Sequence, residues 1–236
     1  DCSNVRKIKE HTKIFFTDEK EYRQDCPCCN RRLSYRGLKC TEEEVLKNIQ
    51  TEDIIIVDNL NKVTLNVLKK VENKAFIDIG YLGPLMYASF QELKELLGSR
   101  FEIINLNERV YNVLKKKFEI DSMDLYDALK PKILIITRGK RGADILFNGD
   151  FLKKEVDTPA VEVDSSGAGD AFFSVFIHEY LSREEMDEKV ISLAYMKAES
   201  LARQVVRHIG ARTHLEPLYK IENYKGCICE EITIQE

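Results

Sequence analysis

Residues 161–176 read VEVDSSGAGDAFFSVF. A β-branched run leads into a glycine-rich turn, and an apolar segment typical of a buried helix follows at once. Ligands of parallel α/β sheets bind outside the carboxyl ends of the strands, where such turns lie. The stretch therefore predicts a ligand site at the start of this helix.

The turn itself is suited to an anion. A helix N-terminus exposes backbone N–H groups and the positive end of the helix dipole. Gly167, Ala168 and Gly169 carry little or no side chain, so a phosphate group can approach these N–H groups closely. We expect these three residues to form an anion hole.

Asp170 stands in the same turn, where its carboxylate would repel a bound phosphate. The contradiction disappears if a substrate hydroxyl group lies between the two. Asp170 then accepts the hydroxyl proton, and the N–H groups stabilise the charge that develops on a transferred phosphoryl group. Turn composition alone leaves a simpler alternative, an ordinary helix N-terminus with an acid in its first turn.

Two other phosphate-binding motifs are absent. The sequence contains no G-x-x-x-x-G-K-[ST] loop. A dinucleotide fingerprint requires a third glycine, and Phe172 occupies that position.

Strands and helices alternate on the N-terminal side of this turn. Residues 143–156 read as a hairpin around Asn148 and Gly149. Two helices follow the turn, at residues 171–181 and about 184–207. Short apolar runs predict strands at residues 53–59, 75–80, 101–107 and 132–139. The alternation predicts an α/β sandwich, a mostly parallel sheet with helices on both faces.

The first part of the chain differs from this pattern. Residues 1–41 are polar and rich in cysteine, and residues 5–17 and 31–38 read as strands, so we expect a small β-rich element there, lid-like or appended. Cys26 and Cys29 have the spacing of a zinc knuckle, and reduced thiols without metal are the alternative. Residues 42–236 are expected to form the α/β domain.

Composition limits the remaining options. The chain has 236 residues, of which 44% are hydrophobic, enough for one large domain with a small appendage. The net charge is -4 and no long basic tract occurs, so we expect no nucleic-acid partner. No apolar run reaches the length of a membrane span, and we expect neither an anchor nor a signal peptide. The odd count of seven cysteines favours reduced thiols in a cytoplasm.

The string VEVDSSGAGDAFFSVF resembles the C-terminal signature DTxGAGDxF of the ribokinase, or phosphofructokinase-B, family of sugar and nucleoside kinases. Ser165 and Ser166 replace the usual threonines. Two weaker similarities occur in the expected order. Thr137, Gly139 and Gly142 resemble a T-x-G-x-x-G segment that lines the nucleotide, and residues 199–211, which include Gly210, resemble the helix and turn that close the adenine side. The resemblance covers about residues 53–213.

The resemblance implies a ribokinase-like fold and transfer of the γ-phosphoryl group of Mg-ATP to a hydroxyl of a sugar, a nucleoside or a similar small molecule. It makes residues 42–236 the nucleotide-binding and catalytic domain. Asp170 becomes the catalytic base, and Gly167, Ala168 and Gly169 become the anion hole. Asp164, assisted by Ser166, is implied to bind a monovalent cation such as K⁺; its alternative is a turn-capping acid.

The chain departs from the family pattern in two places. The family's N-x-x-E motif can be read as Asn105 with Glu108, or with Asn107 as the cofactor-binding asparagine. We favour Asn107, which stands at the predicted strand–helix turn. Val110 then takes the place of the acid, or Glu108 substitutes for it in organising Mg²⁺. The family's sugar-binding Gly-Gly segment is also missing, since Gly37 is the only glycine in the first seventy residues.

These departures keep a second hypothesis open. The chain is then a degenerate kinase fold that binds a nucleotide or a protein partner without catalysis. The sequence identifies neither the acceptor nor the oligomeric state, and a homodimer is one of the alternatives.

Overall fold

The computed structural model describes residues 16–17, 22–23, 41–58, 60–81, 83–98, 100–156, 160–183 and 186–208. The chain divides into two compact units, Asp1–Cys40 together with Tyr219–Glu236, and Thr41–Leu218. In the first unit, β1 (Phe16–Thr17) pairs antiparallel with β2 (Tyr22–Arg23). β1 ends the first expected strand, whereas β2 forms in a segment expected to be a loop. The strand expected at residues 31–38 lies outside the described residues.

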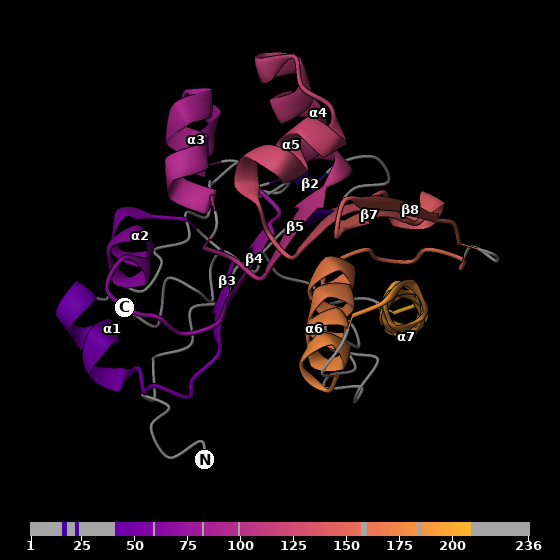
Figure 1. Cartoon of the computed structure of the whole chain (residues 1–236). Coiled ribbons are helices and arrows are strands. Elements are labelled where there is room, and N and C mark those ends of the chain that lie inside the picture. Colours follow the sequence, from indigo (N-terminus) through magenta and orange to yellow (C-terminus); the bar gives the residue numbers. More distant parts are fainter. Residues whose placement is uncertain are drawn as a thin grey trace. The chain divides into compact units, whose positions relative to one another are not determined.

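The second unit is built on a six-stranded sheet with the order β3-β4-β5-β6-β7-β8 (Figure 1). The first four of these strands run parallel, and β7 and β8 are added antiparallel as a hairpin. The predicted mostly parallel sheet is therefore confirmed. The strands are β3 (Ile55–Val57), β4 (Ala75–Ile79), β5 (Ile103–Asn107), β6 (Ile133–Thr137), β7 (Ala143–Phe147) and β8 (Asp150–Lys154).

Helices cover both faces of this sheet, as predicted. α2 to α5 pack over one face in one hydrophobic cluster, and α6 and α7 form a second cluster on the other face (Figure 1). The helices are α1 (Glu42–Asn48), α2 (Lys62–Leu68), α3 (Phe90–Leu97), α4 (Glu108–Phe118), α5 (Ser122–Leu129), α6 (Ala168–Leu181) and α7 (Glu188–Val205), with short 3₁₀ turns at η2 (Gly83–Met86) and η3 (Gly139–Arg141).

Side-chain alternation assigns the strand residues to the two faces. Phe76, Ile103 and Ile133 are register partners across β4, β5 and β6, are buried, and pack against α6 and α7. Their neighbours Ile77, Ile104 and Leu134 face α2 to α5. Nearly continuous apolar strands of this kind are typical of a parallel sheet covered on both sides.

α6 runs antiparallel to the parallel strands, and this direction positions the site. Its last turn carries Tyr180, whose ring packs edge-to-face on Phe76 with centroids 5.8 Å apart. The Tyr180 hydroxyl donates a hydrogen bond to Glu102, which directly precedes β5. The C-terminus of α6 therefore lies at the start of the strands. Its N-terminus, with the glycine-rich turn, lies at their carboxyl ends.

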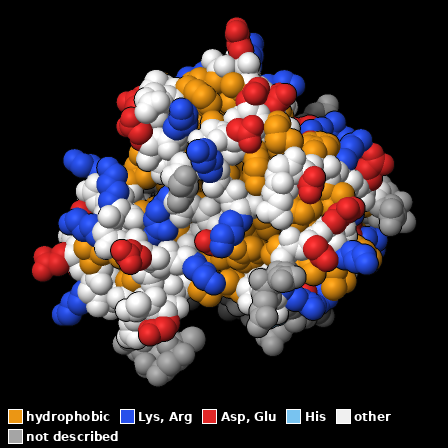
Figure 2. Space-filling model, viewed as in Figure 1, with side chains coloured by type: hydrophobic (Ala, Val, Ile, Leu, Met, Phe, Trp, Pro, Cys, Tyr) orange, Lys and Arg blue, Asp and Glu red, His pale blue; other side chains and the backbone are white. Residues whose placement is uncertain are grey.

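None of the helices in the described part of the chain combines the length and the hydrophobicity that a membrane-spanning helix needs. Figure 2 shows Lys and Arg side chains interspersed with Asp and Glu over the visible face. The coloured side chains on this face form no extended surface of a single charge.

Candidate active site

The DSSGAGD turn joins an extended segment to α6 through a left-handed residue. Gly167 has φ 79° and precedes the helix as its N-cap. The Asp164 carboxylate accepts a hydrogen bond from the Ser166 backbone N–H at 2.9 Å, and the Ala168 N–H donates to the Ser165 carbonyl at 3.2 Å. The turn is therefore held by its own first three residues. A positive φ at Gly167 suits glycine, because other residues pay a steric cost there.

The N-terminus of α6 exposes backbone donors. The first helical hydrogen bond runs from the Ala171 N–H to the Gly167 carbonyl at 2.9 Å. No residue in the described part of the chain accepts a hydrogen bond from the N–H of Gly169 or Asp170, as expected in a first helical turn. A Cβ atom added at Gly169 would meet no atom within 4 Å, so the space above the turn is open. These features are those of an anion-binding helix N-terminus.

Asp170 is exposed in this first turn and lies close to a second carboxylate, Asp78 of β4. Burial raises the pKa of Asp78 to about 6, and the negative charges of Asp170 and Asp58 raise it further. A hydrogen bond from Asn105 acts in the opposite direction. Asp58 directly follows β3, Asp78 stands near the end of β4, and Asp170 lies in the first turn of α6, so all three lie at the carboxyl ends of the strands.

Asp78 and Asn105 end the row of side chains that faces α6. Phe76 and Ile103 are apolar register partners, and two residues further along the same strands the partners are Asp78 and Asn105. The Asn105 Nδ2 donates to the Asp78 Oδ1 at 2.9 Å. Asn105 is only 2% exposed, and its Oδ1 has no hydrogen-bond partner in the described structure. The row thus changes from apolar to polar where α6 begins.

Asp78 is not among the predicted site residues, and Asn105 belongs to them only in the alternative register of the N-x-x-E motif. The available signal was an acid in the strand AFIDIG, which is otherwise apolar and buried. An ionisable group in such a strand requires a partner or a function.

Asn107 lies at the turn from β5 to α4, as the favoured register predicted. Its Oδ1 accepts a hydrogen bond from the Val110 N–H at 2.9 Å, and its Nδ2 donates to the Gly80 carbonyl at 2.9 Å. Val110, which takes the position of the acid in this register, is buried at 2% exposure. The side chain therefore packs in the core, and no carboxylate points outward from that position.

Glu108 is held by arginines. It forms an ion pair with Arg141, and its Oε1 lies 4.0 Å from Nη1 of Arg138. Both arginines belong to the turn between β6 and β7, which follows Thr137, the last residue of β6, and also contains Gly139 and Gly142. The Thr137 hydroxyl donates to the Leu106 carbonyl at 3.3 Å, which ties this turn to the end of β5.

Three of the predicted site residues cannot be placed. Gly210, Cys26 and Cys29 lie outside the described residues. Within the described ranges, no group of three or more His, Cys, Asp or Glu side chains is arranged to hold a metal ion. Asp58, Asp78 and Asp170 interact electrostatically but do not form such a group.

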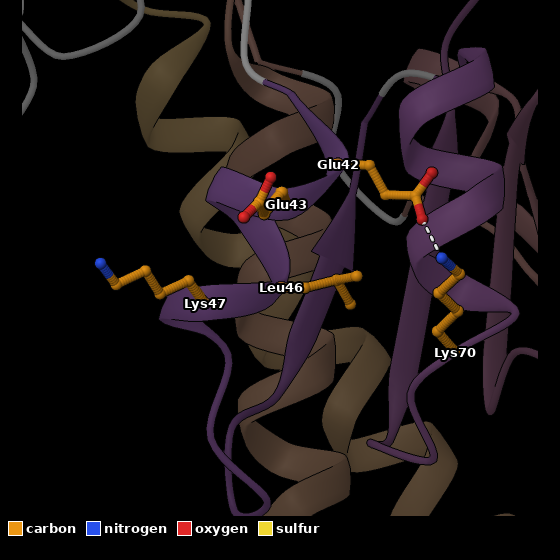
Figure 3. Close-up of a pocket in the computed structure, with 5 residues that line it drawn as sticks. All are labelled: Glu42, Glu43, Leu46, Lys47 and Lys70. Carbon is orange, nitrogen blue, oxygen red and sulfur yellow. Dashed lines mark ion pairs between the residues drawn. The ribbon is translucent and has the colours of Figure 1, made fainter.

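A hollow of about 610 Å³ lies beside α1 and α2 (Figure 3). Glu42 forms an ion pair with Lys70 there, whereas Lys47 points away from both. Its lining residues come from α1 and from Lys70, which lies between α2 and β4. None of them lies at the carboxyl end of a strand. Its side chains do not converge on a common point, and we do not assign it to the site.

Comparison with known proteins identifies the class. The sequence model of the pfkB family carbohydrate kinases matches residues 5–217. The chain therefore belongs to the pfkB family of carbohydrate kinases, and the predicted resemblance is confirmed. The matched region extends further toward the N-terminus than residues 53–213, where the motifs occur. A search of curated protein sequences returned no match.

Solved structures of ribokinase-fold kinases share this fold. The nucleoside kinase of Methanocaldococcus jannaschii has 19% identity and a TM-score of 0.57, over 69% of this chain and 52% of its own. The Burkholderia thailandensis nucleoside kinase in complex with inosine has 18% identity and a TM-score of 0.60, over 73% and 55%. A fructokinase double mutant from Vibrio cholerae, bound to fructose, ADP and a potassium ion, has 15% identity and a TM-score of 0.56, over 75% and 66%.

These similarities confirm the ribokinase-like fold. The family whose model matches is that of the carbohydrate kinases, and these structural neighbours are nucleoside kinases and a fructokinase. The chain spans about half to two thirds of the length of the three solved structures.

Proposed function

We propose that the protein transfers the γ-phosphoryl group of ATP to a hydroxyl group of a sugar, a nucleoside or a similar small molecule. The observation that carries the proposal is the start of α6. There, backbone N–H groups without an acceptor among the described residues share one helical turn with an exposed carboxylate, at the carboxyl ends of the strands. Family membership and the bound fructose, inosine and ADP of the structural neighbours support it.

Asp170 is the catalytic base in this proposal. The acceptor hydroxyl binds between Asp170 and the γ-phosphoryl group, and its oxygen forms a bond to phosphorus while the bond to the β-phosphate oxygen breaks. The hydroxyl proton passes to Asp170, and ADP is the leaving group. Because such transition states are loose, a weak base that is well positioned is sufficient.

Gly167, Ala168 and Gly169 form the anion hole. The N–H groups of this turn are fixed by the helix, so they stabilise charge on the transferred group without reorganising. Asp78 and Asn105 lie beside the reacting groups. The Asp78 carboxyl group, which accepts a hydrogen bond from Asn105, can accept another from a further hydroxyl group of the substrate.

Magnesium enters as part of the substrate Mg-ATP. Mg²⁺ keeps several water ligands and binds through phosphate oxygens with few protein ligands, so a preformed protein cage is not required. Glu108 remains the predicted acid for organising this ion, although it is ion-paired with Arg141 in this structure. Asp164 and Ser166 remain the proposed residues for binding a monovalent cation. The Asp164 carboxylate accepts a hydrogen bond from the Ser166 N–H.

The decisive experiment compares wild type with Asp170→Asn in an assay of ATP consumption against a panel of sugars and nucleosides. We expect a folded variant that binds ATP and has lost at least about a thousandfold in turnover, the scale of a missing general base with its positioning. Asp150→Asn is the control and should be fully active. Asp150 is the first residue of β8 and lies at the opposite end of the strands from Asp170. A variant that keeps most of its turnover would refute Asp170 as the base.

The rival function is nucleotide or partner binding without catalysis. It is favoured by the buried Val110 at the position of the family acid. Wild-type protein that binds ATP but phosphorylates no acceptor in the panel would support it. The proposal of phosphoryl transfer also includes the expected division into a lid-like or appended β-rich element at residues 1–41 and a nucleotide-binding and catalytic domain at residues 42–236.

A further inference from the structure

Two aspartates occupy neighbouring positions at the carboxyl ends of β3 and β4. In the register of these strands, Val57 pairs with Ile77. The next residue of each chain segment is an acid, Asp58 after β3 and Asp78 within β4, so the two acids lie at equivalent positions on parallel neighbours. Asn105, the partner of Asp78 on β5, continues the row. Asp58 is exposed and Asp78 is half-buried, so the row is open to solvent on the side of β3.

This row is unfavourable for folding. Like charges directly opposite on neighbouring strands are destabilising, and a half-buried carboxylate loses hydration. Burial, and after it the charges of Asp170 and Asp58, raise the pKa of Asp78 to about 6. Asn105 is 2% exposed and donates to Asp78, yet its own Oδ1 has no hydrogen-bond partner in the described structure. A polar row that is left unsatisfied in this way is typical of a binding site more than of a structural contact.

No described lysine or arginine neutralises these acids. Within the described ranges, none of the ion pairs includes Asp58, Asp78 or Asp170. Lys62 and Arg109 lie in the first turns of α2 and α4, and these helices cover the other face of the sheet (Figure 1). The side of the sheet that meets the start of α6 therefore carries uncompensated negative charge.

The space beside the row is open. A Cβ atom added at Gly80, two residues after Asp78, would meet no atom within 4 Å. The same holds for Gly169, which directly precedes Asp170. In the proposed function, this is the space that the acceptor enters.

We propose that the acceptor carries an amino group as well as hydroxyl groups, as an amino sugar does, and that its ammonium group binds between Asp58 and Asp78. This inference rests on the proposed phosphoryl transfer and names the class of its acceptor. An ammonium group has three donors and forms charge-assisted hydrogen bonds with carboxylates. It relieves the repulsion between the two acids, whereas a phosphate group on the acceptor would add to it. The row thus selects a cationic acceptor and rejects a phosphorylated one.

Isothermal titration calorimetry at pH 7 without ATP measures this selection. At this pH the amino groups are mainly protonated and Asp78, with a pKa of about 6, is mainly ionised. The probes are two matched sets of a neutral sugar, its amino sugar and its phosphate: glucose, glucosamine and glucose 6-phosphate, and fructose, 1-amino-1-deoxyfructose and fructose 6-phosphate. In at least one set, the amino sugar should bind at least about tenfold more tightly than the neutral sugar, and the phosphate more weakly than both.

Asp58→Asn tests the row itself. Asp58 is exposed, so the variant should fold, which circular dichroism checks. It should bind the preferred amino sugar about tenfold more weakly and the neutral sugar within about twofold of wild type. Asp127→Asn, which removes an exposed charge from α5, is the matched control and should bind every sugar as wild type does. A merely structural role for Asp58 would lower the affinity for all sugars alike, and that result, or no change at all, overturns the proposal.

The wild type alone also decides the matter. Protein that binds neither amino sugar, or binds neither more tightly than its neutral sugar, overturns the proposal. ATP consumption with the same six sugars separates this outcome from the proposed function. If an amino sugar binds as expected but no sugar supports ATP consumption, phosphoryl transfer fails and the class of ligand stands. If a neutral sugar is phosphorylated while the amino sugars bind no better, transfer stands and the class of acceptor is wrong.

Discussion

The variant Asp78→Asn should be more stable than the wild type at pH 8, and the gain should shrink as the pH falls. Burial raises the pKa of Asp78 from 3.8 to about 6, with smaller contributions from the charges of Asp170 and Asp58. An asparagine keeps an oxygen that accepts the 2.9 Å hydrogen bond from Asn105. Its amide also offers a donor to the unpartnered Asn105 Oδ1. The substitution thus removes mainly the charge.

The magnitude follows from the pKa change. A rise of about two units, at about 1.4 kcal/mol each, gives a cost of up to about 3 kcal/mol of unfolding free energy for the ionised group. The folded-state pKa lies above the unfolded one, so ionisation opposes folding. The cost is absent below about pH 4, grows as the pH rises through 6, and is complete above about pH 7. At pH 5 about half of the gain should remain.

Urea unfolding followed by circular dichroism at pH 5 and pH 8 measures this difference. Asp127→Asn, an exposed position on α5, is the control and should change stability by less than about 0.5 kcal/mol at both pH values. Asp170→Asn should recover a smaller part of the gain, because its charge is a secondary cause of the raised pKa. A variant Asp78→Asn that is less stable than wild type at pH 8, or equally stabilised at both pH values, would refute the reasoning.

Other substitutions test the turns that build the site. Gly169→Ala meets no atom within 4 Å, so stability measured by thermal unfolding should hold while the methyl group above the N–H donors lowers turnover about tenfold or more. Asn107→Ala removes the α4 cap and the bond to Gly80, and urea unfolding should show a loss of about 1–2 kcal/mol. Gly142→Ala places a Cβ 2.0 Å from a carbonyl oxygen and should destabilise by more than about 2 kcal/mol, whereas Gly149→Ala, with φ 82° but open space, should cost only about 1 kcal/mol.

Local chemistry made several elements predictable from the sequence. Asn148 and Gly149 have φ 50° and 82°, which a two-residue hairpin turn requires and which these residues tolerate. Gly167 likewise marks the left-handed entry to α6. The predicted helix at residues 171–181 was too short at its start, since α6 begins at Ala168, because the N-cap lies in the glycine turn itself. Boundaries of this kind depend on backbone angles more than on apolar periodicity.

The pairing of Asp78 with Asn105 was not predictable, because it depends on register between strands that are 27 residues apart. Asp78 and Asn105 come together only when β4 and β5 align in parallel, and they meet the start of α6 only when this helix packs across both strands. The arginines at Glu108 are a similar case, since Arg141 is 33 residues further along the chain. Motif spacing within one segment carries no information on such contacts.

The sheet order separates the charges of this edge. β3 and β4 bring Asp58 and Asp78 to the side where Asp170 lies, whereas the turn that follows β6 brings Arg138 and Arg141. β5 lies between them and ends in uncharged asparagines. A phosphate chain is attracted to the basic side and repelled from the acidic side, while acceptor hydroxyls bind well to carboxylates. In the proposed function, this separation gives the acid beside the anion hole a role in transfer. The donor then approaches from the side of β6 and the acceptor from the side of β4, and only the transferred group reaches the start of α6.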